Sequence, residues 1–94
     1  MIYGTNTRNG YPRGTTDRQQ KVEIRSLLVC GALTEFIDVF EGMTVEQIVN
    51  KLALKYGYIV LDGKYIIGGI EVNKKSIPTT LDMIEVEFAW LITP

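Results

Sequence analysis

The order of local structural signals between Lys21 and Phe88 constrains the fold of this chain more than any other feature. Two strand-like runs come first, a helix with a clear start signal follows, and further strand-like runs complete the order. A short turn containing Gly31 separates the first two runs, so they predict an antiparallel hairpin. We therefore expect an α+β fold, in which one helix packs on a mixed sheet.

The first hairpin is predicted from alternating apolar residues. One strand is expected over residues 21–30, which begin with period-two alternation, and a second over residues 35–41. In the second strand Ile37 faces the helix, while Phe36 and Phe40 share the opposite face.

The helix is predicted from its start signal and its apolar stripe. Thr44 followed by Gln47 forms the Thr-x-x-Gln pattern of a capping box, and Gly57 is suited to end the helix. The stripe, with i, i+3, i+4 spacing, consists of Val45, Ile48, Val49, Leu52, Ala53 and Tyr56. We expect this face of the helix to cover the sheet.

The segment after the helix is expected to add a second hairpin. Asp62-Gly63-Lys64 lies between two β-branched runs and predicts a tight turn within residues 58–67. Gly68-Gly69 predicts a bend, and Pro78, which cannot donate a ladder hydrogen bond, predicts an edge or a loop. Residues 84–88 alternate cleanly and predict a strand with one buried face.

Two short motifs resemble those of a known superfamily. Residues 70–78, Ile-Glu-Val-Asn-Lys-Lys-Ser-Ile-Pro, resemble the valine-asparagine-glycine-x-x-valine-proline turn of sulfur-carrier proteins, and residues 81–86 resemble the lead into their last strand. On these motifs residues 21–88 resemble the ubiquitin-like β-grasp superfamily, nearest to its sulfur-carrier branch. The resemblance implies a β-grasp sheet with one packed helix. Sulfur carriers end in a free Gly-Gly, whereas the Gly-Gly here is internal at residues 68–69, so carrier chemistry is not expected.

The composition argues against most kinds of catalysis. The chain has 94 residues, a length for one small domain, with no histidine and one cysteine. Cys30 therefore lacks an activating histidine and is expected to be a small core or edge residue at the end of the first strand, and the scattered carboxylates indicate a solvated strand face. We expect a non-enzymatic protein with no cofactor and no metal site.

Charge and hydropathy bear on partners and location. The net charge of −1 disfavours nucleic acid and anionic membranes as partners. No apolar run reaches the roughly 20 residues needed to cross a bilayer, and the start of the chain lacks the apolar core of a signal peptide. A cytoplasmic location, or a virion assembled in the cytoplasm, is the expectation.

Residues 1–20 differ in composition from residues 21–94, so we divide the chain into an extended N-terminal arm and a β-grasp domain. The arm is rich in Gly, Asn, Thr and Arg and has no periodic apolar positions. Tyr3 and Tyr11 could anchor it on a protein surface, and Arg8 and Arg13 could pair with carboxylates or phosphates.

The remaining candidate partner-binding residues lie on the sheet. Phe36 and Phe40 face away from the helix, and Trp90 and Leu91 add apolar surface near the C-terminus. Either the arm or the second hairpin covers these side chains, or they contact another protein. The two explanations remain equally open from sequence.

The expected function is a non-catalytic, protein-binding structural subunit of a larger assembly, such as a viral or phage particle. Its partners would be other proteins or copies of itself, held by the arm and an apolar sheet face. The alternatives are a sulfur-carrier relative that serves a biosynthetic enzyme, and a small regulatory domain that binds one enzyme.

Overall fold

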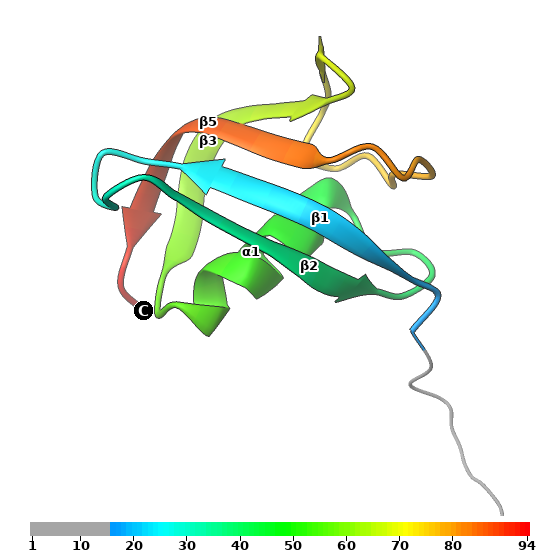
Figure 1. The fold of residues 1–94 in the computed structure, drawn as a ribbon, viewed down its shortest axis with the longest axis horizontal. Coiled ribbons are helices and arrows are strands. Elements are labelled where there is room, and N and C mark those ends of the chain that lie inside the picture. Colours follow the sequence, from blue (N-terminus) through cyan, green and yellow to red (C-terminus); the bar gives the residue numbers. More distant parts are fainter. Residues whose placement is uncertain (1–15) are drawn as a thin grey trace, which may run out of the picture.

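One helix lies across one face of a five-stranded mixed sheet in the computed structural model, which describes residues 16–94 (Figure 1). The fold is a small α+β fold, as the sequence predicts. The elements along the chain are β1 (Arg18–Arg25), β2 (Ala32–Val39), α1 (Val45–Lys55), β3 (Ile59–Ile67), β4 (Ile70–Glu71) and β5 (Ile84–Ile92). Tyr3, Arg8, Tyr11 and Arg13 lie outside the described residues.

The strands are ordered β2-β1-β5-β3-β4 in the sheet. Strand β1 pairs antiparallel with β2, as the predicted hairpin requires, and parallel with β5. Strand β5 pairs antiparallel with β3, and β3 pairs with the short β4 at the far edge. The first and last strands are therefore neighbours at the centre of the sheet.

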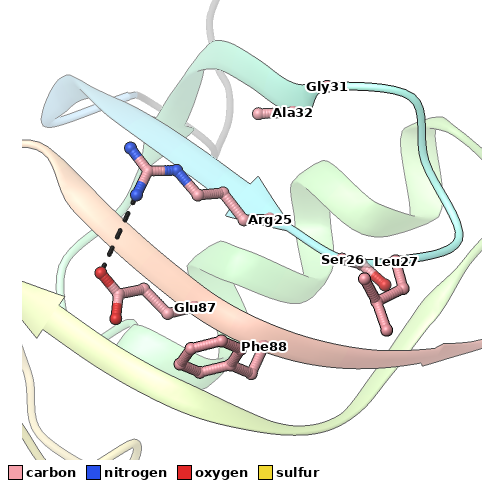
Figure 2. A pocket seen from close by; sticks show the side chains of 7 residues that line it. All are labelled: Arg25, Ser26, Leu27, Gly31, Ala32, Glu87 and Phe88. Carbon is pink, nitrogen blue, oxygen red and sulfur yellow. Dashed lines mark ion pairs between the residues drawn. The ribbon is translucent and has the colours of Figure 1, made fainter.

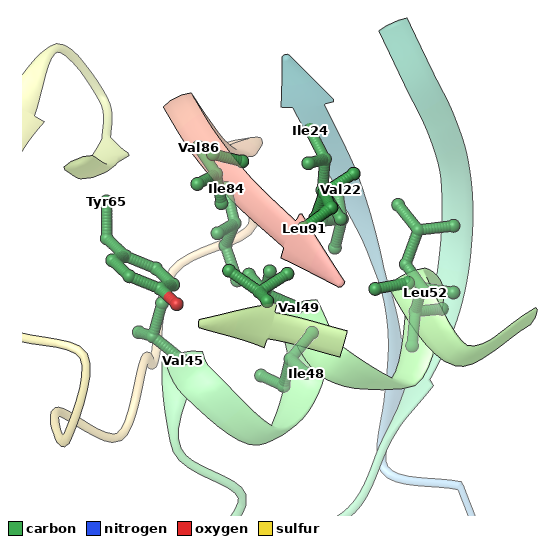
Figure 3. Packing of buried hydrophobic residues seen from close by; sticks show 14 of the residues in the cluster. Val22, Ile24, Val45, Ile48, Val49, Leu52, Tyr65, Ile84, Val86 and Leu91 are labelled. Atoms are coloured by element: carbon green, nitrogen blue, oxygen red, sulfur yellow. The ribbon is translucent and has the colours of Figure 1, made fainter. Parts of the chain in front are cut away.

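The hydrophobic core lies between the helix and this central pair of strands (Figure 3). The helix contributes five buried side chains of the predicted stripe, and β1 and β5 contribute side chains that are fully buried. Burial of one such aliphatic side chain stabilises the fold by about 1.5–3 kcal/mol. The fully buried members are Val22, Ile24, Val45, Ile48, Val49, Leu52, Ala53, Ile84 and Val86.

The predicted capping box at the start of the helix is confirmed. Thr44 Oγ1 accepts a hydrogen bond of 3.2 Å from the Gln47 amide, and Gln47 Oε1 accepts one of 2.9 Å from the Thr44 amide. Two further first-turn amides, of Val45 and Glu46, donate to the carbonyls of residues 76 and 74 at 2.8 and 2.9 Å. The turn at residues 73–76 therefore completes the cap and fixes the helix to the chain that leads into β5.

The prediction that Tyr56 belongs to the buried stripe is wrong. Tyr56 is the C-cap and is exposed, and Gly57 follows with φ +85°. Both Lys55 and Tyr56 hydrogen-bond to the Glu35 carboxylate of β2, and these bonds hold the pKa of Glu35 below its usual range. The end of the helix is thereby tied to the edge of the sheet.

The first hairpin differs from its predicted bounds. Strand β1 begins at Arg18, inside the segment assigned to the arm, and ends at Arg25, because the apolar residues that follow form a loop. Gln20 is fully buried, its Nε2 donates to the Asp82 carbonyl, and Arg18 donates to Gln20 Oε1 at 3.2 Å. Sequence reasoning missed this network because a glutamine in a polar segment carries no apolar signal.

The predicted turn at Asp62-Gly63-Lys64 is wrong, and so is the added hairpin. These residues lie inside the unbroken strand β3, which pairs with β5 through two register shifts. Long-range pairing with β5 overrides the local turn preference of Asp-Gly. Gly68 and Gly69, both with positive φ, form the two-residue turn between β3 and β4.

Residue 63 must be a glycine because strand β5 passes too close to it to leave room for a side chain. A Cβ atom at this position would lie 2.6 Å from Val86 Cγ1 and 3.4 Å from Ala89 Cα. We predict that Gly63→Ala lowers the free energy of unfolding by about 1–3 kcal/mol, the usual cost of overpacking a core. Urea denaturation measures this loss.

A double-mutant cycle tests the cause of that loss. Val86→Ala removes the side chain that the new methyl group would meet. The double variant should therefore lose less stability than the sum of the two single variants. Additive losses would contradict a steric role for this contact.

Tyr65 makes the stability depend on pH in the alkaline range. Burial, with the nearby Glu46 and Asp62 carboxylates, raises the pKa of Tyr65 to about 12. An unfolded tyrosine ionises near pH 10, so the unfolded chain loses this proton first. We predict that the contribution of Tyr65 to stability is constant below pH 10 and falls as the pH rises toward 12.

Comparison with Tyr65→Phe isolates this effect from the other groups that titrate in the same range. The free energy of unfolding of the wild type should fall more steeply between pH 10 and 12 than that of the variant. Parallel pH profiles for the two proteins would show that Tyr65 does not titrate as described.

Candidate functional site

A bulge in β5 places Phe88 outside the regular alternation of the strand. Ile84 and Val86 point into the core, but the next inward residues are Ala89 and Leu91, so Phe88 is the extra residue. Its φ is +56°, in the left-handed region, and its side chain is 85% exposed. A bulky residue in this conformation is a strained outlier. The expectation that Phe88 shares the buried face with Ile84 is therefore wrong.

The loop between β1 and β2 carries exposed apolar side chains beside this bulge. Leu27 is fully exposed and Leu28 is mostly exposed, while Val29 packs against the core. The Val29 amide donates to the Ser26 carbonyl at 3.3 Å, and the Leu28 amide donates to Ser26 Oγ at 3.3 Å. These local bonds form a turn that directs Leu27 and Leu28 toward solvent.

The loop and the bulge line an open cleft of about 620 Å³ (Figure 2). A smaller cleft of about 320 Å³ continues from it along β5 and shares Ser26, Leu27 and Phe88 with it. Trp90, which is 66% exposed, lines this second part. We call the two together the loop–bulge cleft. Its remaining lining residues are Arg25, Leu28, Gly31, Ala32, Glu87, Ala89 and Leu91.

A charged cluster adjoins the apolar part of the cleft on the sheet face away from the helix. Arg25 lies 2.8 Å from Glu23, 4.0 Å from Glu85 and 3.8 Å from Glu87, the last pair being drawn in Figure 2. Among the described residues, Glu23 Oε1 has no partner that meets hydrogen-bond geometry despite its short distance to Arg25. One guanidinium thus faces three carboxylates, and the cluster carries a net negative charge.

The four sheet residues predicted to bind a partner lie in different environments. Phe36 is exposed on the face away from the helix, as expected, and Trp90 lines the cleft. Phe40 lies just past the end of β2 and is half-buried, with Lys51 Nζ of the helix 4.7 Å from its ring centroid, so the expectation that it faces away from the helix is wrong. Leu91 is 2% exposed and belongs to the core, so it offers no free surface and its assignment to partner binding is corrected.

Sequence reasoning missed Leu27 and Phe88, the two exposed residues common to both parts of the cleft. The apolar run at residues 27–29 continues the alternating strand and was indistinguishable from it by periodicity. The exposure of Phe88 follows from a bulge, which depends on the register with β3 and leaves no local pattern. The exposure of Leu27 and of Phe88 could therefore be identified only from the tertiary structure.

The side chains that line the cleft provide no pair suited to nucleophilic catalysis. Ser26 Oγ accepts a bond from a backbone amide of its own loop, and Glu87 pairs with Arg25. Cys30 is exposed in the same loop and is not among the lining residues, so the expectation that it ends a strand as a core or edge residue is wrong. Within residues 16–94, no group of three or more acidic or cysteine side chains is placed to hold a metal ion.

Comparison of the chain with protein-family models, with curated proteins and with solved structures finds no match. In the part of the chain that the structure describes, no helix has the length and apolarity to span a membrane.

Two substitutions separate the effect of the strained backbone at residue 88 from the effect of its aromatic ring. Phe88→Ala removes the ring and keeps the strained backbone, whereas Phe88→Gly also relieves the strain. We predict that the glycine variant is more stable than the alanine variant by about 1 kcal/mol, since a left-handed residue with a Cβ costs about that much. Urea denaturation of both variants measures the difference, and a less stable glycine variant would show that the bulge is unstrained.

Proposed function

We propose that this chain is a non-catalytic protein-binding domain of the β-grasp type, which docks a partner protein in the loop–bulge cleft as a subunit of a larger assembly. The β-grasp assignment is supported by the strand order β2-β1-β5-β3-β4, with a parallel central pair and a helix between β2 and β3. The observation that carries the functional proposal is the conformation and exposure of Phe88.

Phe88 carries two energetic costs that the isolated fold does not require. Its backbone is strained, and its aromatic ring is left in water. A glycine at this position would make the same bulge without either cost. Contact with a partner would offset the exposure of the ring, which explains why a phenylalanine stands there.

The neighbours of Phe88 have the composition of an interface centre. Leu27, Leu28 and Trp90 are exposed around it, and aromatic residues are frequent binding anchors. The cleft between them is broadly open, so a side chain resting in it would lose part of its contact with water. This arrangement favours a partner that presents a bulky apolar side chain.

The charged cluster indicates which charge the partner segment carries beside its apolar side chain. Glu23, Glu85 and Glu87 share Arg25, so a cationic group beside the cleft would meet carboxylates that lack a full counter-charge. Lys64 lies opposite Glu87 in the register of β3 and β5, but no ion pair joins them in the described part of the chain. We therefore infer that the partner segment carries an arginine or lysine next to its apolar side chain.

Binding to a peptide array tests this proposal. The purified full chain is applied to synthetic 12-residue peptides that vary independently in charge and in apolar content. We predict that peptides combining a basic and a bulky apolar residue bind best, and that their affinity falls as salt is raised. NMR titration with a bound peptide should shift the amide signals of Leu27, Gly31 and Phe88.

Two variants control the experiment. Phe88→Gly should abolish binding without loss of stability, whereas Leu81→Ser, which removes a highly exposed leucine outside the cleft, should bind normally. Selection of acidic peptides, or unchanged binding by Phe88→Gly, would overturn the proposal.

A further inference from the structure

Strand β2 forms one edge of the sheet and is unusually regular for an edge strand. All eight of its residues pair with β1 without a register shift, and no second neighbour covers it among residues 16–94. Natural edge strands are protected by proline, lysine, bulges or short length. The sequence of β2, Ala-Leu-Thr-Glu-Phe-Ile-Asp-Val, has none of these features, and Lys51 of the helix reaches the edge only at the Asp38 carbonyl.

The two acidic residues of β2 do not protect the edge either. The Glu35 carboxylate is held by Lys55 and Tyr56 of the helix. The Asp38 carboxylate accepts a hydrogen bond of 3.0 Å from Gln19 Nε2 on β1. Both charges are therefore directed toward groups of their own domain.

The hydrogen bonds of β2 indicate which backbone groups point out of the sheet. The Val39 carbonyl accepts from the Asp17 amide at 2.9 Å, on the β1 side, whereas the Asp38 carbonyl accepts from Lys51 Nζ at 2.8 Å. Because backbone groups alternate in direction along an antiparallel strand, Thr34 and Phe36 share the outward direction of Asp38. The edge thus presents donors and acceptors at alternate residues.

We propose that two copies of this chain pair through β2 in an antiparallel, two-fold arrangement centred on Phe36. In this register Phe36 lies opposite Phe36 of the second copy, and Thr34 lies opposite Asp38, so the outward backbone groups meet as hydrogen-bonded pairs. The Asp38 carbonyl can accept a second bond, since a carbonyl oxygen has two lone pairs.

The side chains favour this register over the neighbouring one. A two-fold axis at Phe36 places Glu35 opposite Ile37, and Leu33 opposite Val39, so no like charges meet. An axis at Glu35 would place the two Glu35 carboxylates directly opposite each other, which is destabilising. Phe36, 61% exposed in the single copy, would instead face its equivalent across the axis as an aromatic cross-strand pair.

We choose a second copy of this chain, and not a strand of another protein, because the β2 edge is complementary to itself in this register. A two-fold axis perpendicular to the sheet would join the two sheets into one of ten strands. Both helices would then lie on one face, and both loop–bulge clefts would open on the other. The pairing leaves Phe88 free, so it is independent of the proposed docking site.

Light scattering after size-exclusion chromatography of the full chain, over a range of concentrations, tests this pairing. We expect a dimer whose dissociation constant rises at least tenfold in Phe36→Lys. The control Leu81→Lys places a lysine at another exposed apolar residue and should dimerise like the wild type. Phe88→Gly should also remain dimeric.

Amide hydrogen exchange provides the second measurement. The Phe36 and Thr34 amides point out of the sheet, so they should be protected in the wild-type dimer and exchange rapidly in Phe36→Lys. A chain that stays monomeric at millimolar concentration overturns the proposal. A dimer insensitive to Phe36→Lys, or one in which these amides exchange freely, also overturns it and indicates another surface. If these amides are protected from exchange only when a foreign peptide is added, the strand that pairs with β2 does not come from a second copy of this chain, and the proposal is overturned.

Discussion

The parallel pairing of β1 with β5 is the interaction on which the rest of the fold depends. These strands are far apart in the sequence, and their inward residues are fully buried against the helix. Parallel neighbours require a crossover connection, and here the intervening chain supplies β2, the helix and β3. Once β1 and β5 are joined, β2 and β3 can pair only on their outer sides, which fixes the order of the sheet.

The bulge in β5 arises where this central strand also pairs with β3. The register between β3 and β5 shifts twice, on either side of Asp62, and Gly63 lies against the backbone of β5 near Ala89. The close approach is possible because Gly63 has no side chain, and the extra residue on β5 is Phe88. Packing inside the sheet therefore accounts for the position of the bulge, and the side chain at residue 88 lines the cleft.

Among residues 16–94 one helix covers one face of the sheet, and the opposite face and the β2 edge carry the two proposed contact surfaces. The outer face carries the charged cluster around Arg25 and, at its end, the loop–bulge cleft. The β2 edge carries backbone groups and Phe36. Side-chain shape and charge would select the partner at the cleft, whereas main-chain hydrogen bonds would supply most of the affinity at the edge. The two proposed surfaces would thus suit different kinds of contact.

The sequence by itself determined the helix, its capping box and the alternation that buries Val22, Ile24, Ile84 and Val86, because these depend on spacings of two to four residues. It also indicated the antiparallel hairpin and the outward position of Phe36. Only the tertiary structure decided that residues 62–64 continue a strand, that Gln20 is buried, that Leu91 is in the core and that Phe88 is exposed. Each of these depends on contacts with strands distant in the sequence, whose register no local pattern records.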